Sequence, residues 1–298
     1  MKEFKPNVVL SDSRASPIFA ARLLHIPVVL ILNQFRVEII RRPSNKKLTL
    51  FERFFFRIAN LGWMFPRTAI GIVWGMSQAI LIPDLPNPFT ISTSNLAIPK
   101  SYVDKIRLIG PIIGTTSNEV ARTRTKHSRP RIYAAISGPR REREVLGKIL
   151  EESLHHLSSK YNIVLSRGNP KGTLKPHRVH GIRVYDWIRN QDEWMKKCDI
   201  IVARAGHGTI MKSLTYGKPM VLIPIPDHTE QMGNAKRAES MHVARVIQQN
   251  NLNPTTLDAS LQTVLNGRYL KHAEAISKSV SSLNAVSIAC DVIESLTA

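Results

Sequence analysis

Between residues 131 and 225, short apolar runs alternate with longer segments of helical character. The runs are rich in β-branched residues and too short for helices, which is typical of buried parallel strands. They cover residues 131–136, 161–165, 181–185, 199–202 and 220–225. Strands and helices in this order predict an α/β fold with a doubly wound parallel sheet.

A length of 298 residues suits two domains better than one. The glycines and proline of residues 110–114 and the polar, basic segment after them indicate a boundary. We expect an N-terminal domain over residues 1–114, a basic linker over 115–130 and a C-terminal domain over 131–298. Apolar residues at helical spacing predict one long amphipathic helix over residues 270–296.

The N-terminal part has fewer elements. Strands are expected at residues 7–10, 28–32, 79–82 and 105–109, with a helix at residues 17–24. Asp12 follows the first strand and is the one well-placed carboxylate of this region. A capping or turn role for Asp12 is favoured over general base catalysis.

A glycine turn follows the strand at residues 199–202. Gly206 and Gly208 let the backbone turn tightly and approach a bound group closely. The amides at the start of the next helix are unpaired and lie at its positive end, so a phosphate over residues 206–209 would be held by backbone donors. A plain strand-to-helix turn is the alternative for an isolated Gly-x-Gly.

A second polar turn follows the strand at residues 220–225. It contains Glu230 and Gln231, at the carboxyl edge where open α/β sheets bind ligands. A carboxylate beside an amide offers acceptors and donors together, which suits neighbouring sugar hydroxyls. The two turns are expected to face one pocket.

At these residues the chain resembles the GT-B glycosyltransferases, specifically the family 28 type. The family includes the bacterial enzyme that adds N-acetylglucosamine to a lipid-linked peptidoglycan precursor, and the pattern is shared by the broader UDP-glycosyltransferases. The resemblance covers residues 131–298 strongly and residues 7–111 more weakly. It implies two Rossmann-like domains, the N-terminal one incomplete because such domains open with further units that often carry the catalytic base.

The resemblance also implies roles for individual residues. Trp187 and Ile188 match a pair that packs on the nucleotide base, although Trp187 is an equally good core anchor, and Glu230 and Gln231 match the pair that holds the donor sugar. His207 could also be a merely exposed residue. The positions near the diphosphate are Ser137, Gly138, Arg204, Ala205, Gly206, His207, Gly208 and Thr209.

Lys212 departs from the family pattern. It stands where relatives usually have a glutamate that binds both ribose hydroxyls, so the charge at this position is reversed. Either Lys212 donates to the ribose or the diphosphate, or nucleotide binding is weakened. The sequence leaves both possibilities open.

The net charge of +20 favours anionic partners such as a lipid surface, a polyphosphate or a nucleic acid. No nucleic-acid reading module is recognisable, which disfavours the last. Basic residues alternate with aromatics over residues 41–67, and Phe51, Phe54, Phe55 and Ile58 share one helical face. This pattern predicts a helix at an anionic membrane interface, although a core helix has the same spacing.

The sequence contains few signals for a metal cofactor or for secretion. The two cysteines have no zinc-type spacing, so neither a metal site nor a disulfide is expected. No run reaches the length of a spanning helix, and the first residues lack a signal-peptide core. We expect a cytoplasmic protein, peripheral on the inner face of the membrane.

The sequence therefore predicts a glycosyltransferase that moves a hexose or N-acetylhexosamine from a UDP-sugar, without a bound metal, to an acceptor that could be lipid-linked. The alternative is a non-catalytic nucleotide-sugar-binding subunit that needs a partner chain for the missing N-terminal half. The sequence does not reveal the sugar, the stereochemical outcome or a secure catalytic base.

Overall fold

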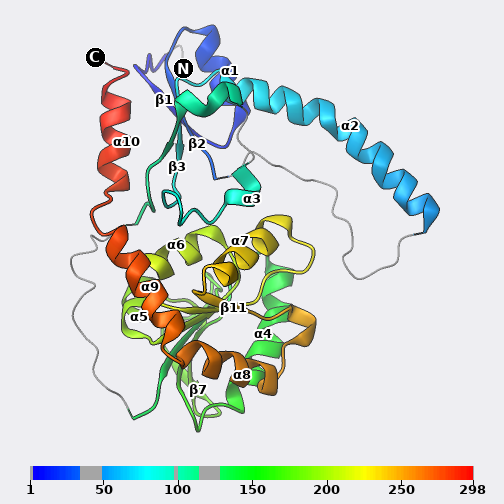
Figure 1. Cartoon of the computed structure of the whole chain (residues 1–298), viewed down its shortest axis with the longest axis vertical. Helices are drawn as coiled ribbons and strands as arrows, with labels where there is room; N and C mark the ends of the chain where they lie inside the picture. The colour runs from blue at the N-terminus through cyan, green and yellow to red at the C-terminus, as the bar shows by residue number, and fades with distance from the viewer. Residues whose placement is uncertain (1–2, 34–48, 97–99, 114–127, 298) are drawn as a thin grey trace. The chain divides into compact units, whose positions relative to one another are not determined.

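The computed structural model describes residues 3–33, 49–96, 100–113 and 128–297, which form two compact units. Unit 1 contains Met1–Gly114 and Leu283–Ala298, and unit 2 contains Thr115–Ser282. Each unit is an α/β structure built on parallel strands, as predicted (Figure 1). Residues 283–298 belong to unit 1, whereas the sequence analysis placed them in the C-terminal domain. Most of the expected linker 115–130 lies outside the described residues.

Unit 1 has a four-stranded parallel sheet in the order β1-β2-β3-β4. All four strands occur where they were predicted, although the first begins at Val9 rather than Asn7. The strands are β1 (Val9–Asp12), β2 (Val28–Ile31), β3 (Ala79–Ile82) and β4 (Ile106–Leu108). The helices are α1 (Ala15–Leu23), α2 (Leu50–Gly75), α3 (Thr93–Leu96) and α10 (Ala285–Glu294), with a 3₁₀ helix at Lys100–Lys105.

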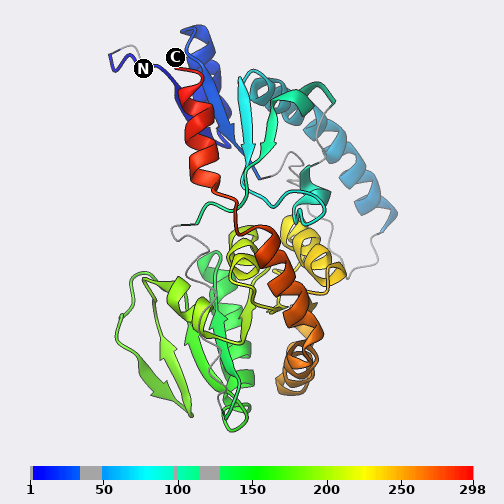
Figure 2. The ribbon, with the colours of Figure 1, turned by 60° about the vertical axis from the view of Figure 1, so that its left-hand side comes forward.

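Both faces of this sheet are covered. Ile18 of α1 and Trp74 of α2 pack with Leu30 and other residues on one face. On the other face α10 runs alongside the sheet (Figure 2), and its Val292 and neighbouring residues pack with Val29. Burial on two faces explains why β3 is apolar at every position instead of alternating.

The predicted long helix over residues 270–296 is wrong. Two helices take its place: α9 (Arg268–Ser279) in unit 2 and α10 in unit 1. The side chain of Asn284 accepts a hydrogen bond from the amide of Ser287 at 3.0 Å, which caps a new helix and starts it afresh. The apolar spacing continues across the break because each helix buries one face, so periodicity alone could not reveal it.

Unit 2 has a seven-stranded sheet in the order β11-β10-β9-β5-β6-β8-β7. The strands are β5 (Arg131–Ala135), β6 (Asn162–Ser166), β7 (His177–Val179), β8 (Ile182–Tyr185), β9 (Ile200–Ala203), β10 (Met220–Leu222) and β11 (Ala244–Val246). The helices are α4 (Arg140–His155), α5 (Gln191–Lys197), α6 (His207–Thr215), α7 (Thr229–Ser240), α8 (Pro254–Leu265) and α9, with a 3₁₀ helix at Gln249–Asn251.

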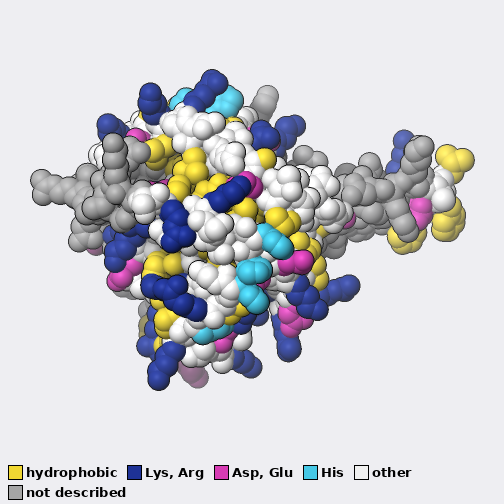
Figure 3. Space-filling model, turned by 90° about the horizontal axis from the view of Figure 1, so that it is seen from below, with side chains coloured by type: hydrophobic (Ala, Val, Ile, Leu, Met, Phe, Trp, Pro, Cys, Tyr) yellow, Lys and Arg dark blue, Asp and Glu magenta, His cyan; other side chains and the backbone are white. Residues whose placement is uncertain are grey.

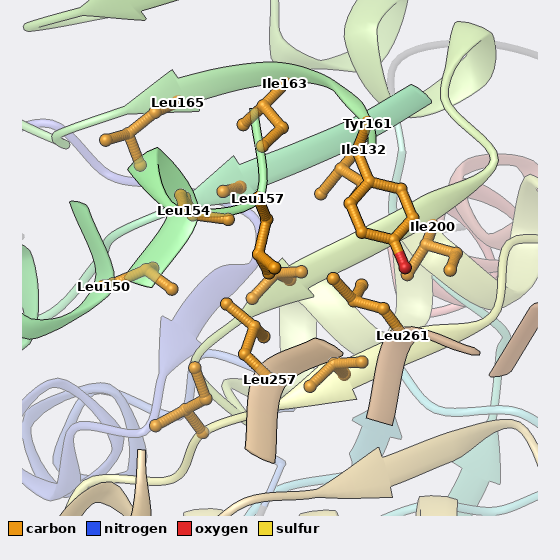
Figure 4. Close-up of a cluster of buried hydrophobic side chains, with 14 of the residues drawn as sticks. Ile132, Leu150, Leu154, Leu157, Tyr161, Ile163, Leu165, Ile200, Leu257 and Leu261 are labelled. Atoms are coloured by element: carbon orange, nitrogen blue, oxygen red, sulfur yellow. The ribbon is translucent and has the colours of Figure 1, made fainter. Parts of the chain in front are cut away.

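The five strands predicted for unit 2 are all present and parallel. Strands β7 and β11 were not predicted, and β7 runs antiparallel to β8 at the edge of the sheet. Leu150 and Leu154 of α4 and Leu257 and Leu261 of α8 pack against Ile132 and its neighbours on one face, forming a large buried cluster (Figure 4). This core fixes the strand ends from which the loops of the site emerge.

Helix α2 carries an apolar stripe that the other described residues of unit 1 leave uncovered. The helix begins with a capping box between Thr49 and Glu52 and extends away from the strands (Figure 1). Side chains on the stripe are largely exposed, and Figure 3 shows hydrophobic groups together at the outer end of the helix, on the right. The exposed residues are Leu50, Phe51, Phe54, Phe55, Ile58, Phe65 and Ile72. Among the described residues of unit 1, these side chains are therefore not packed into a core.

Candidate functional site

The order of strands in unit 2 creates a topological switch beside β5. The chain proceeds from β5 to β6 on one side, and β9 pairs with β5 on the other. Ala135 is in register with Ala203, so the loops that leave β5 and β9 start at the same level of the sheet. Helices that cross to opposite faces leave a crevice at such a point, where doubly wound sheets bind ligands. Ser137 and Gly138 follow β5 here, and Arg204 follows β9.

The glycine turn after β9 leads directly into α6. Gly206 is the N-cap of the helix, with φ −69°, and no side chain caps the exposed amides. No heavy atom lies within 4 Å of a β-carbon added at Gly206 or Gly208, and neither residue has a positive φ. The turn itself therefore does not require glycine at either position. The open space above the helix start suits a group that approaches the backbone closely.

The residues beside the two glycines are more buried than the sequence suggested. Ala205 is fully buried, and His207 is only 8% exposed, so the interpretation of His207 as an exposed residue is wrong. The hydroxyl of Thr209 is on a half-buried side chain in the first turn of α6. Backbone amides rather than side chains are the donors that this turn can offer.

The backbone conformation at position 138 requires glycine. Its φ is +108°, and an added β-carbon would lie 3.4 Å from Cδ1 of Ile225, in the turn after β10. Ser137 and Gly138 are both exposed. The loop after β5 is thus shaped by glycine and lies against the loop after β10.

One buried arginine joins three of these loops. The side chain of Arg204 is 0% exposed, and it donates to the carbonyl oxygens of Ile223, Pro224 and Glu142, each at 3.1 Å. Burial lowers the pKa of Arg204 to about 10, and the nearby carboxylate of Glu142 opposes this shift. The guanidinium is occupied by carbonyl oxygens, so it positions the loops instead of facing the crevice.

Helix α7 supplies the second polar turn. The ring of His228 caps the helix by accepting from the amide of Gln231 at 3.4 Å, and the side-chain oxygen of Gln231 accepts from the amide of Ile225 at 3.0 Å. Gln231 thereby holds the turn itself. Among the described residues, the carboxylate of Glu230 has no hydrogen-bond partner, and its side chain is half-buried. Glu230 is the member of the pair that is available to a ligand.

Asn234 was not recognised in the sequence. It is fully buried on α7, and its amide donates to the carbonyl oxygen of Ala205 at 3.3 Å. This bond ties the glycine turn to α7 and explains how the two polar turns keep their register. Its signal in the sequence was only its place one helical turn after Gln231.

The loop after β8 carries the proposed base-binding pair. Trp187 is half-buried, while Ile188 is 6% exposed and belongs to the core. Asp186 precedes them and fixes the loop after β6 by accepting from the amide of Thr173 at 3.1 Å and from Arg167 at 3.4 Å. Ile188 therefore belongs to the core under this loop, and Trp187 is an aromatic side chain that stays partly exposed. Trp194 packs against Tyr185, which gives it a structural role.

Lys212 is not an isolated cation. Its Nζ lies 2.8 Å from Oδ1 of Asp192, in the first turn of α5. The pair joins α5 to α6 and remains partly exposed. A carboxylate is thus present beside position 212 even though the position itself carries an amine.

Asp12 lies in unit 1. It is the last residue of β1, it is exposed, and it accepts from the hydroxyl of Ser13 at 3.1 Å. The expected cap is not formed, because Arg14 is the N-cap of α1 and no side chain caps that helix. Asp12 stays a candidate by its position at the carboxyl edge of the sheet.

Residues 143–288 match the glycosyltransferase family 28 C-terminal domain. Over these residues the chain is similar to that family. The match contains the turns after β8, β9 and β10 and thus every proposed donor contact except Ser137 and Gly138. The family resemblance predicted from the sequence is confirmed.

Individual relatives agree with the family 28 domain. An uncharacterized glycosyltransferase of Methanosarcina mazei is 25% identical over 295 residues, which are 99% of this chain and 74% of the relative. The UDP-N-acetylglucosamine--N-acetylmuramyl-(pentapeptide) pyrophosphoryl-undecaprenol N-acetylglucosamine transferase of Lactobacillus johnsonii is 30% identical over 171 residues, which are 54% of this chain and 46% of the relative.

Solved structures share the fold over nearly the whole chain. The glycotransferase of kitacinnamycin has a TM-score of 0.67 at 17% identity. The superposition covers 99% of this chain and 77% of the glycotransferase chain. MurG of Acinetobacter baumannii has a TM-score of 0.63 at 18% identity, with coverages of 99% and 75%. The predicted GT-B fold is confirmed.

Two further properties concern the described residues as a whole. They include no cluster of three or more His, Cys, Asp or Glu side chains placed to hold a metal ion. None of their helices combines the length and the apolarity needed to cross a bilayer.

Proposed function

We propose that the protein transfers a sugar from a UDP-sugar to an acceptor and that the donor binds in the crevice beside β5. One observation carries the proposal. Gly206 and Gly208 leave the start of α6 open at the topological switch, although neither the backbone conformation nor any neighbouring atom requires glycine there. An anion held by backbone amides accounts for both glycines.

In this proposal, the diphosphate lies over residues 206–209. The amides at the start of α6 and the helix dipole stabilise the negative charge that develops as the sugar leaves. Arg204 contributes indirectly, because it fixes the loops after β5 and β10 around the diphosphate. The pre-set position of these donors lowers the barrier, since little reorganisation is needed during the reaction.

The donor sugar lies against α7. The carboxylate of Glu230 accepts from sugar hydroxyls, while Gln231 and His228 hold the turn that presents it. Trp187 offers its face to the nucleotide base, and Ser137 and Gly138 border the diphosphate from the β5 side. Asp12 remains a candidate base for the acceptor hydroxyl.

The chemistry of the substrates is proposed from the relatives. The Lactobacillus johnsonii enzyme is named for a UDP-N-acetylglucosamine donor and a pyrophosphoryl-undecaprenol acceptor. A UDP-linked hexose or N-acetylhexosamine and a lipid-linked acceptor are therefore our first candidates for this chain.

Calorimetric titration with UDP, UDP-glucose and UDP-N-acetylglucosamine tests the donor site. We expect UDP to bind and one UDP-sugar to bind more tightly, with that gain lost in Glu230→Ala. Glu152→Ala is the matched control. It removes an exposed carboxylate near the end of another helix, α4, and should bind like the wild type. If no nucleotide binds to the wild type, the proposed donor site is wrong.

The charge reversal at Lys212 favours a second candidate, a nucleotide-sugar-binding subunit that depends on a partner chain for transfer. In that case, donor binding would persist, but the purified chain would release no UDP in the presence of any lipid-linked acceptor. Release of UDP that depends on the acceptor would exclude this candidate.

We further propose that α2 docks on the anionic inner surface of a membrane. Phe51, Phe54 and Phe55 are 77%, 62% and 61% exposed on one face, and the exposed Arg57 lies beside that face. Phenylalanine rings gain free energy by entering the interface, while a chain of net charge +20 is attracted to acidic headgroups.

Sedimentation with vesicles tests this docking. Binding should be strong to vesicles of phosphatidylglycerol and weak to vesicles of phosphatidylcholine, and the double substitution Phe54→Ser and Phe55→Ser should reduce it. Phe4→Ser removes an exposed phenylalanine outside α2 and serves as the control. Equal binding of the double variant and the wild type would argue against α2 as the docking element.

A further inference from the structure

The pair formed by Asp192 and Lys212 joins two helices that both start at the carboxyl edge of the unit 2 sheet. Asp192 is the second residue of α5, directly after the loop of Trp187, and Lys212 lies in the second turn of α6, after the glycine turn. Their side chains are 20% and 36% exposed. The pair is thus partly accessible to a ligand.

The location follows from the two ends of the proposed nucleotide. The diphosphate lies over the start of α6, and the base lies against Trp187 in the loop that leads into α5. The ribose connects these two groups, so it must lie where α5 and α6 meet. Asp192 and Lys212 are the charged pair at that place.

The pair has unused hydrogen-bonding capacity. Lys212 donates to Oδ1 of Asp192, and among the described residues Oδ2 has no donor. An ammonium group has three donors, of which the bond to Asp192 takes one. The two groups together can accept from one hydroxyl and donate to its neighbour, which matches the two vicinal hydroxyls of a ribose.

We infer that Asp192, held in place by Lys212, recognises the ribose hydroxyls of the donor nucleotide. The carboxylate comes from α5 instead of α6, so the amine at position 212 orients the Asp192 carboxylate and does not disable the site. This inference rests on the proposed function, since it assumes a nucleoside diphosphate over α6. It assigns the chain a preference for ribonucleotides over deoxyribonucleotides.

A purely structural ion pair is the competing explanation. Partly exposed pairs contribute only about 0–1 kcal/mol to stability, and their loss does not depend on which ligand is present. The discriminating quantity is therefore the ratio of dissociation constants for two ligands that differ by one hydroxyl, because general destabilisation affects both alike.

The experiment compares UDP with 2′-deoxy-UDP and 3′-deoxy-UDP by calorimetry. In the wild type, removal of a hydroxyl that Asp192 binds should weaken binding about 10- to 150-fold, since a hydrogen bond to a charged group contributes roughly 1.5–3 kcal/mol. In Asp192→Asn and Asp192→Ala, UDP should bind only slightly better than its deoxy analogues. Lys212→Met should lower the ratio partially, and Lys212→Arg should restore it.

Glu193→Gln is the matched control, because it neutralises the adjacent, more exposed carboxylate of the same helix turn. It should keep the wild-type ratio. If UDP binds the wild type but Asp192→Asn keeps the full ratio, the inference is overturned while the donor site stands. If the wild type binds no UDP at all, the proposed function and this inference are both wrong.

Discussion

Replacing Gly206 by alanine adds one methyl group at the point where the proposed diphosphate meets the backbone. In the folded chain, the substitution should be harmless, because φ is −69° and no heavy atom lies within 4 Å of the new β-carbon. Alanine also has less conformational freedom in the unfolded chain. We expect the free energy of unfolding to stay the same or to rise by about 0.4–1 kcal/mol.

Ligand binding should respond in the opposite direction. A methyl group that displaces a phosphate oxygen from one amide removes a hydrogen bond to a charged group, which contributes roughly 1.5–3 kcal/mol. The dissociation constant for UDP should therefore rise about 10- to 150-fold. Calorimetric titration measures the loss of affinity, and urea denaturation of the same samples measures stability.

Gly267→Ala is the control with the reverse pattern. Gly267 also precedes a helix and has open space around it, but its φ is +74°, so alanine there should cost about 1–2 kcal/mol of stability. Its affinity for UDP should not change. Wild-type affinity of Gly206→Ala, or a loss of stability as large as that of Gly267→Ala, would refute the assignment of the turn to a phosphate.

Three other outcomes are expected. Arg204→Met should lower the free energy of unfolding by about 3–5 kcal/mol in urea denaturation, because it leaves two buried carbonyl oxygens and one part-buried carbonyl oxygen without their donor; a change below 1 kcal/mol would contradict its role. Gly168→Ala should also destabilise, since φ is +68° and the added carbon would collide with the carbonyl oxygen of Ile136; a melting temperature like that of the wild type would be inconsistent with this turn. Burial raises the pKa of Cys198 to about 12, so at pH 9 its thiol stays protonated and iodoacetamide should modify the exposed Cys290 alone, as peptide mass spectrometry would show, until urea unfolds the chain; labelling of native Cys198 at that pH would be inconsistent with its burial.

The sequence was sufficient to predict the strands that are buried on both faces. Short apolar runs such as residues 199–202 identify themselves, since a parallel strand covered by helices needs apolar residues at every position. Strands β7 and β11 have three residues each and contain exposed arginines, Arg178 and Arg245, so nothing in their composition distinguishes them from loops. Pairing with a neighbour makes them strands, and a local pattern does not contain that information.

The same limit applies to the site. The glycine turn was predicted because its residues are adjacent in the sequence. The roles of Arg204 and Lys212 were not, since their partners Glu142 and Asp192 are 62 and 20 residues away and meet them only through the packing of helices on the sheet. A buried arginine and a ligand-facing one look alike in a sequence. Their difference lies entirely in the third dimension.

Helix α10 has a consequence for how the chain can be divided. Because Ala285 and Val292 complete the apolar layer against Val29 of β2, unit 1 is assembled from two segments that are far apart in the sequence, and unit 2 lies between them in chain order. A fragment that stops at Ser282 keeps all of unit 2 but exposes one face of the other sheet to water. Unit 1 is therefore discontinuous in the sequence, and an isolated version of it would have to join its two segments.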